Sequence, residues 1–249
     1  MTKPRTVAGA SKVVGVIGGM GPDSTVDFFA KLVAATRAER DQDHLRIVID
    51  NDPTVPDRTA AVEGRGPSPA PRLAAMARGL IAQGAEVLVM PCNSAHAFRT
   101  GVLEAAGDVP FLDLIETTVA ATRARLPTAA TVGLLATDGT LAAKLYDDGY
   151  AAAGVRTLAP TAADQALVME AIYAVKRGRG DAATAASVRG VAERLAAAGA
   201  EAIVAACTEI PLLLRDGDVV VDGRPVPVIA STDALVARTV AFATGAPPD

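Results

Sequence analysis

The chain has few of the residues that metal sites and base-stacking surfaces need. Its 249 residues include only two cysteines, two histidines and no tryptophan, and aromatic residues make up 3%. Two cysteines form no disulfide framework, and the widely spaced His44 and His96 make a His/Cys metal cluster hard to assemble. So few aromatic rings also leave no stacking platform for nucleic-acid bases. We therefore expect no bound metal, no nucleic-acid partner and a reducing, cytoplasmic compartment.

Charge and hydropathy exclude two further classes of surface. The formal net charge of −4 opposes the basic stripe that a nucleic-acid surface requires. The sequence contains no uninterrupted apolar run of about 18 residues, so we expect no membrane span. The first residues, MTKPRTVAGASK, lack the apolar core of a signal peptide. With 50% hydrophobic and 21% charged residues, the composition is typical of a folded globular protein.

Short β-branched runs alternate with alanine-rich helical windows along the whole chain. Candidate strands lie at 13–18, 46–50, 86–91, 110–114, 130–136, 155–159, 201–206 and 226–230. Candidate helices include 70–83, 115–125, 163–177 and 183–198. Continuous apolar strands that alternate with helices predict an α/β fold with parallel sheets covered on both faces. The stretch 52–69 shows no periodicity and is interpreted as a long irregular loop, a candidate lid.

The sequence also repeats itself. The segment QGAEVLVMPCNS (83–94) aligns with AGAEAIVAACTE (198–209) at an offset of 115 residues. Two further pairs of segments align at offsets of 117 and 118 residues. Similar offsets at three places predict two pseudo-symmetric Rossmann-like lobes, 1–125 and 126–249, with the last helix packing back on the first lobe. The active site is expected in the cleft between them.

Each half carries one cysteine, Cys92 or Cys207, at the carboxyl end of the corresponding strand. Ligands of open parallel α/β sheets bind at that end of the strands. A lone free cysteine is often only a small buried hydrophobe. A pair in register across a repeat instead favours two thiols on opposite sides of one small substrate, where one removes a proton and the other returns one. The polar residues that follow, Asn93, Ser94 and Thr208, suit helix caps and carboxylate binding.

Five segments carry a resemblance to a known family: GVIGGMGPDSTVDFF (15–29), VIDNDPTVPDRTAAV (48–62), VMPCNSAHAF (89–98), LLATDGTLAAKLY (134–146) and AACTEIPLLL (205–214). The sequence resembles the aspartate/glutamate racemase superfamily, in particular its aspartate racemases that work without pyridoxal phosphate (PLP). This resemblance implies a cofactor-independent amino-acid racemase that interconverts L- and D-aspartate, with glutamate as a second candidate. It implies Cys92 and Cys207 as the acid/base pair, and a homodimer.

The resemblance also implies roles for residues around the thiols. Asn93, Ser94 and Thr208 would hold the α-carboxylate and amino group, and Arg58 would grip the side-chain carboxylate through its fork of donors. Lys176 would contact the substrate, although a cation near a helix C-terminus is also expected from the helix dipole alone. The full set of expected substrate-binding residues is Met20, Asn51, Arg58, Asn93, Ser94, Thr137, Lys176, Thr208 and Glu209.

Two departures from the family pattern leave substrate choice open. Ala206 replaces the usual glycine before Cys207, and Ser94 replaces the usual threonine after Cys92-Asn93. Hydantoin racemases, maleate cis–trans isomerases and broad-specificity amino-acid racemases resemble the same architecture. Arylmalonate decarboxylases keep only one cysteine and are disfavoured.

Readings from other classes compete as well. A non-catalytic binding protein for acidic amino acids would need no acid/base pair. The loose fingerprint Gly19-x-Gly21-x-x-Ser24 would suit a nicotinamide or flavin enzyme only weakly, because Pro22 removes one backbone donor.

Overall fold

The eight strands expected from the sequence form two separate parallel sheets of four. The computed structural model describes residues 11–36 and 38–246. The first sheet has the order β2-β1-β3-β4 and consists of β1 (Val14–Gly18), β2 (Ile47–Asn51), β3 (Val87–Val89) and β4 (Phe111–Leu112). The second has the order β10-β7-β5-β6 and consists of β5 (Thr131–Ala136), β6 (Arg156–Leu158), β7 (Ala202–Ala206) and β10 (Val228–Ala230). The expected α/β class with two parallel sheets is confirmed.

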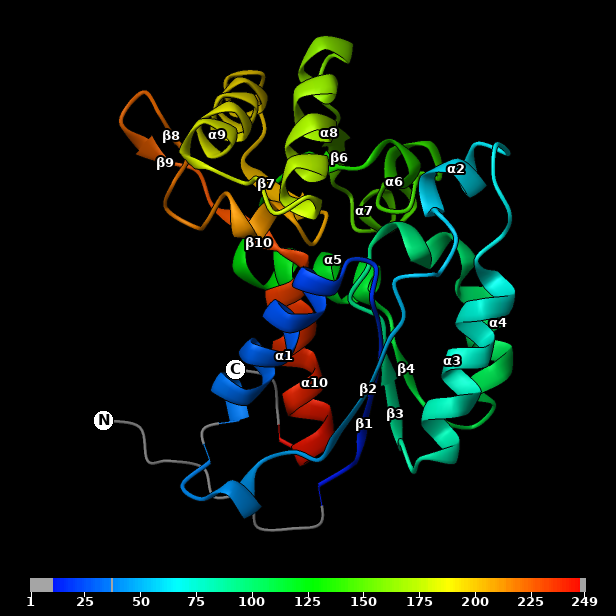
Figure 1. Ribbon diagram of the computed structural model, residues 1–249. Coiled ribbons are helices and arrows are strands. Elements are labelled where there is room, and N and C mark those ends of the chain that lie inside the picture. The colour runs from blue at the N-terminus through cyan, green and yellow to red at the C-terminus, as the bar shows by residue number, and fades with distance from the viewer. Residues whose placement is uncertain (1–10, 37, 247–249) are drawn as a thin grey trace.

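Helices cover both faces of each sheet (Figure 1). In the first lobe, α1 (Pro22–Thr36) and α10 (Ser231–Thr244) pack on one face, and α3 (Ala70–Ala82) and α4 (Arg99–Ala106) on the other. In the second, α8 (Ala162–Lys176) and α9 (Ala182–Ala197) oppose α5 (Leu114–Arg125) and α7 (Asp147–Ala152). The strands explain these layers, because successive side chains alternate between the faces. Leu134 contributes to the cluster beneath α5 and α7, and Leu135 to the cluster beneath α8 and α9.

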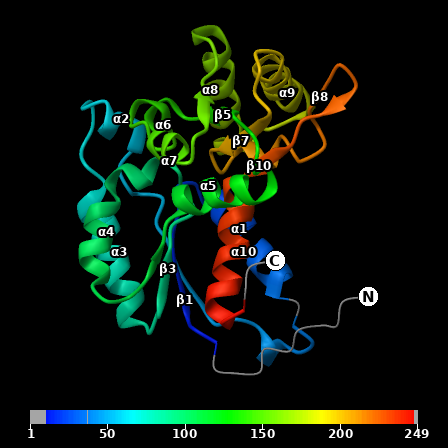
Figure 2. The same ribbon diagram turned by 180° about the vertical axis from the view of Figure 1, so that it is seen from behind.

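Two helices exchange lobes. α10 follows β10 of the second sheet, yet it packs against α1 of the first lobe, and its Leu235 is fully buried in that core. α5 follows β4 of the first sheet, and its Ile115 is buried in the second lobe. The two helices also pack against each other (Figure 2). Each fully buried aliphatic side chain contributes roughly 1.5–3 kcal/mol, so the exchange ties the lobes together. The boundary at 125/126 stays a prediction, because α5 lies before it in sequence.

The stretch 52–69 is not entirely irregular. It contains a short helix, α2 (Arg58–Val62), which begins where the Asp57 carboxylate accepts a hydrogen bond from the backbone N–H of Ala60 at 2.7 Å. The expectation of a loop without secondary structure was therefore wrong for these five residues, because a helix this short has no apolar periodicity to detect.

The remaining elements are short connections. They are α6 (Asp138–Ala142), the turns η1 (Asp41–Asp43), η2 (Ser94–Phe98) and η3 (Ile210–Leu212), and the hairpin strands β8 (Val220–Val221) and β9 (Arg224–Pro225). Among the helices of the described residues, none combines the length and the apolar character that crossing a bilayer requires.

Candidate functional site

One cavity lies where the carboxyl ends of the two sheets meet. Its accessible volume is about 30 Å³, and its walls come from both lobes. Its lining residues are Met20, Asp57, Arg58, Thr59, Cys92, Asn93, Ser94, Thr137, Thr140, Met169, Ile172, Tyr173, Lys176, Cys207, Thr208 and Glu209. Both cysteines are among them, so the thiols of the two halves open to the same space.

The strands deliver the thiols to this cavity. β3 ends at Val89 and is followed by Met90, Pro91 and Cys92, and β7 ends at Ala206, directly before Cys207. Both cysteines are free thiols and nearly buried, with 4% of Cys92 and 6% of Cys207 exposed. Buried thiols that still line a cavity are reached by a guest within it but are shielded from bulk solvent.

Cys207 belongs to a buried charged cluster. Its Sγ donates a hydrogen bond to Glu209 Oε2 at 3.0 Å, and Lys176 Nζ lies 2.5 Å from Glu209 Oε1. Ser24 Oγ, at the start of α1, donates to the same Oε1 at 3.2 Å. Glu209 is 2% exposed, so its charge is compensated by protein groups rather than by water.

These contacts set the protonation states. Burial, followed by the negative charge of Glu209, raises the pKa of Cys207 well above its ordinary value, although the Lys176 charge acts the other way. Burial alone would raise the pKa of Glu209, but the Lys176 charge and the hydrogen bonds from Cys207, Lys176 and Ser24 hold it below its ordinary value. The proton between Cys207 and Glu209 therefore rests on sulfur.

The charges of both cysteines affect the pKa of Lys176. Burial would lower the pKa of Lys176, but the charges of Glu209, Cys207 and Cys92 together raise it. The ammonium group thus stays protonated and stabilises negative charge on either sulfur. Lys176, Arg58 and Glu209 also line a neighbouring cavity with Gly19, Gly21, Pro22, Asp23, Pro53 and Val175, so they stand at the border between the two spaces.

The position of Cys92 is fixed by a hydrogen bond to its backbone carbonyl group. The carbonyl oxygen of Cys92 accepts a hydrogen bond from Nδ1 of His96 at 2.9 Å, and the backbone N–H of Leu114 donates to Nε2 at 3.1 Å. Burial lowers the pKa of the His96 imidazole, against the charge of Asp113. A neutral ring with its proton on Nδ1 satisfies both bonds, so His96 joins the Cys92 loop to the start of α5. Ser94 Oγ approaches the Cys92 sulfur at 3.8 Å.

The segment carrying Arg58 reaches across from the first lobe. α2 packs against α6 of the second lobe so tightly that a Cβ added to Gly139 would come within 2.8 Å of the Thr59 Cα (Figure 1). Nη1 of Arg58 donates to the carbonyl oxygens of Val55 and Pro56, each at 3.2 Å, while its buried Nε has no hydrogen-bond partner among the residues that the structure describes. The guanidinium is thus oriented by its own loop and keeps donors free.

The structure places eight of the nine expected substrate-binding residues on this cavity, and Asn51 is the exception. Asn51 is exposed at the end of the edge strand β2. The turn at Gly19, which has a φ of +90°, packs so closely on the Asp52 backbone that a Cβ on Gly19 would approach it to 2.4 Å. This turn is followed by Met20, which lines the cavity. A role for Asn51 in substrate binding stays a prediction.

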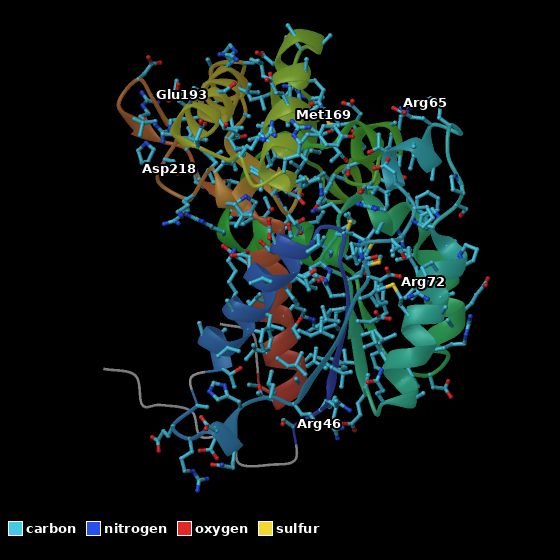
Figure 3. All side chains as sticks on the ribbon, in the orientation of Figure 1. Arg46, Arg65, Arg72, Met169, Glu193 and Asp218 are labelled. Carbon is cyan, nitrogen blue, oxygen red and sulfur yellow. The ribbon has the colours of Figure 1, made fainter. Side chains whose placement is uncertain are left out.

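Six lining residues were missed from the sequence: Asp57, Thr59, Thr140, Met169, Ile172 and Tyr173. Thr140 had a detectable signal, because Thr137 caps α6 by accepting a hydrogen bond from the Thr140 backbone N–H at 3.2 Å. Met169, which Figure 3 labels on α8, lies with Ile172, Tyr173 and Lys176 at the spacing of one helix face. That spacing is equally typical of a core-facing stripe, so it gave no functional signal.

The site offers two thiols, several hydroxyls, an amide, two cations and the two carboxylates of Asp57 and Glu209. Within residues 11–36 and 38–246, no group of three or more His, Cys, Asp and Glu side chains is placed to hold a metal ion. Thiols can give up and accept protons, and the cations and hydroxyls beside them are groups that bind carboxylates.

Known proteins are similar to this chain in sequence and fold. A family model described as Asp/Glu/Hydantoin racemase matches residues 17–239. An aspartate racemase of Picrophilus torridus is 31% identical, with a TM-score of 0.81 and 96% of each chain covered. A homologue of aspartate racemase from Pyrococcus horikoshii OT3, at 22% identity and a TM-score of 0.75 over 94% of this chain and 99% of that one, shares the fold.

A glutamate racemase of Deinococcus radiodurans is 35% identical over 142 residues, which make up 54% of this chain and 45% of that protein. The chain thus matches less than half the length of this relative.

Proposed function

The chain belongs to the Asp/Glu/Hydantoin racemase family, and from that premise we propose that it interconverts L- and D-aspartate, with glutamate as the second acidic candidate, without PLP. The racemases of this family are isomerases, and the chain is assigned to that enzyme class. The family resemblance noted in the sequence is confirmed. The substrate and the chemistry at the two thiols are proposals.

The observation that carries the proposal is that Cys92 and Cys207, at equivalent strand ends of two lobes, line one cavity. In the proposed step, the thiolate of one cysteine takes the α-proton and becomes a thiol, leaving a carbanion at Cα. The thiol of the other cysteine then donates its proton to the opposite face and becomes a thiolate. No electrons are gained or lost, and the product is the mirror image of the substrate.

The resting protonation state favours Cys207 as the first acid. Its pKa is raised by burial and by Glu209, so it begins as a thiol. Cys92 would then act as the first base, with the positive charge of Lys176 stabilising its thiolate. After turnover the roles are reversed, and Lys176 again supports the negative sulfur, now that of Cys207.

The weak acidity of the α-proton requires further help. Donors preorganised around the developing negative charge are often the largest contribution to catalysis. We assign this role to the hydroxyls of Ser94 and Thr208 and to the backbone N–H groups that follow Cys92 and Cys207. Arg58, held over the cavity on α2, is the proposed partner of the distal carboxylate.

The test is proton exchange in D₂O with protein freed of PLP by a carbonyl trap and dialysis. Early in the reaction with L-aspartate, deuterium should appear at Cα of the D-product while recovered L-aspartate keeps its proton, because two separate groups act. Cys92→Ser and Cys207→Ser should each nearly abolish interconversion, since a hydroxyl is a far poorer base than a thiolate. Exchange that requires added PLP, or binding of aspartate without exchange, would refute the proposal.

The substrate is tested in the same assay. If aspartate and glutamate stay inert while another amino acid racemises, the two-thiol chemistry stands and the assignment of substrate fails. Because the matching family model also covers hydantoin racemases, a 5-substituted hydantoin is the next compound to assay.

The assembly and compartment follow from resemblance and chemistry alone. We propose a homodimer, as the family resemblance implies, and a cytoplasmic location, where reducing conditions keep both thiols free. Size-exclusion chromatography with light scattering tests the first of these.

A further inference from the structure

A buried hydrogen-bond chain joins the loops that carry the two cysteines. Ser231 Oγ, at the start of α10, donates to the carbonyl oxygen of Ala205 at 3.0 Å, on the strand that leads to Cys207. Asn93 Nδ2 donates to Ser231 Oγ at 3.1 Å. Asn93 directly follows Cys92, so two hydrogen bonds connect one cysteine loop to the strand of the other.

Tyr146 closes the other end of this chain. It lies between α6 and α7 of the second lobe, and its hydroxyl donates to Asn93 Oδ1 at 2.5 Å. The Tyr146 side chain does not line the cavity. Its hydrogen bond to Asn93 therefore links it directly to a residue that does line the cavity.

The direction of every bond in the chain is fixed. Ser231 has one hydroxyl proton, which goes to the Ala205 carbonyl, so its oxygen can only accept from Asn93. The nitrogen of the Asn93 amide must therefore face Ser231, and its oxygen must face Tyr146. The phenol must then be the donor, and burial, which raises the pKa of Tyr146, keeps it protonated. Such a chain allows Asn93 one orientation.

The chain is also dry. Tyr146 is 1% exposed, Asn93 3% and Ser231 0%, so water cannot replace a lost partner. Thr118 Oγ1, a second acceptor for the phenol, lies farther away at 3.5 Å. Without the hydroxyl of Tyr146, the buried oxygen of Asn93 would lack a donor that it can recover only by moving. A shift of this kind would displace the neighbouring Cys92.

We propose that Tyr146 is a positioning residue for the racemase reaction, which orients the Asn93 amide and thereby holds Cys92 in register with Cys207. This inference rests on the proposed function. A displacement of about 1 Å between reacting groups costs up to about 100-fold in rate. The structure offers a matched control, because Tyr150 is equally buried and stacks on Tyr146 with ring centroids 6.0 Å apart. Its hydroxyl bonds instead to Thr122 Oγ1 at 2.8 Å.

The experiment compares Tyr146→Phe with Tyr150→Phe. Both variants delete one buried, hydrogen-bonded hydroxyl from one core and should lower Tm by similar amounts. Only Tyr146→Phe should lower kcat, by about 10- to 100-fold, while KM stays within about threefold. Wild-type kcat in Tyr146→Phe, or an equal loss of kcat in both variants, would overturn the proposal.

Ser231→Ala is the second variant, should Tyr146→Phe not fold. It removes the acceptor of the Asn93 amide and should show the same fall in kcat at nearly constant KM. A normal kcat in this variant, or a rise in KM alone, contradicts the proposed role of the Tyr146–Asn93–Ser231 chain in positioning Cys92.

A readout without turnover separates the inference from the proposed function. Amide hydrogen exchange of peptides covering 92–96 should be at least about tenfold faster in Tyr146→Phe than in wild type, and unchanged in Tyr150→Phe. If the wild-type protein shows no racemase activity and the difference in amide exchange is still seen, the proposed function fails. The Tyr146–Asn93–Ser231 hydrogen-bond chain then stands as a structural link between the two cysteine loops. If the wild-type protein racemises its substrate but amide exchange of 92–96 is as slow in Tyr146→Phe as in wild type, the positioning role of Tyr146 is refuted and the proposed function stands.

Discussion

The thiol of Cys207 donates a hydrogen bond to the carboxylate of Glu209 across 3.0 Å, with both groups nearly buried. The same carboxylate binds the ammonium group of Lys176. Glu209 therefore opposes ionisation of Cys207, while Lys176 favours it. Burial raises the pKa of Cys207 most, and the balance of these two charges then adjusts how readily the sulfur gives up its proton.

Replacing Glu209 should make Cys207 more reactive. In Glu209→Gln the negative charge is lost while Lys176 remains, so the pKa of Cys207 should fall from its raised value. Iodoacetamide, which reacts with the thiolate, should then alkylate Cys207 several-fold faster at pH 8 in a Cys92→Ser background. Lys176→Met should have the opposite effect. Glu170→Gln, an exposed position on the same helix as Lys176, is the control. Slower alkylation in Glu209→Gln would contradict the charge balance.

Arg58 should matter for acidic substrates in particular. Arg58→Lys keeps the charge but loses the fork that binds carboxylate with two bonds, so KM for aspartate should rise about tenfold or more. A neutral amino acid that is turned over should show little change. Arg65→Ala is a suitable control. Arg65 lies in the same stretch, 52–69, as Arg58 (Figure 3), but it is exposed and pairs with Glu63. Equal losses for acidic and neutral substrates would remove Arg58 from the distal-carboxylate role.

The site residues that could be predicted from the sequence are those that lie at the ends of predicted strands. Cys92 and Cys207 could be found because strand ends in a parallel sheet converge, and the internal repeat marked the two positions as equivalent. Asn51 lies at the end of a strand as well, but β2 is an edge strand, and Asn51 is not among the residues that line the cavity with the two cysteines.

Other features depend on contacts that no local pattern records. The Tyr146–Asn93–Ser231 chain joins residues that lie far apart in sequence. The packing of α5 on the second lobe could not be predicted either, because an amphipathic helix has the same apolar periodicity whichever sheet it covers. Short elements such as α2 lie below the length at which periodicity is informative.

His96 should remain neutral through the physiological range and make the protein sensitive to mild acid. Burial holds the pKa of its imidazole below the value in the unfolded chain, about 6.5. The unfolded state then binds a proton that the folded state does not, so stability is fully present above that pH and falls as pH drops below it. Tm should decline from about pH 6.5 downwards, less steeply in His96→Gln, which starts from a lower Tm. An NMR titration in which the imidazole signals of His96, identified by their loss in His96→Gln, shift above pH 6.5 would be inconsistent with this assignment.

Gly139 should control how closely α2 covers the cavity. A methyl group at this position meets the Cα of Thr59 at 2.8 Å, and because that atom is backbone, α2 must move as a unit. In Gly139→Ala, Arg58 and Thr59 would therefore retreat from the cavity, and KM for aspartate should rise several-fold. Tm should change little, because alanine suits the helical backbone of α6.

The control is Gly79→Ala in α3, where an added Cβ meets nothing within 4 Å. This substitution should stabilise the protein by roughly 0.5–1 kcal/mol, measured by urea unfolding, and leave KM unchanged. A wild-type KM in Gly139→Ala would mean that α2 does not need its close contact with α6 to bring Arg58 to the substrate.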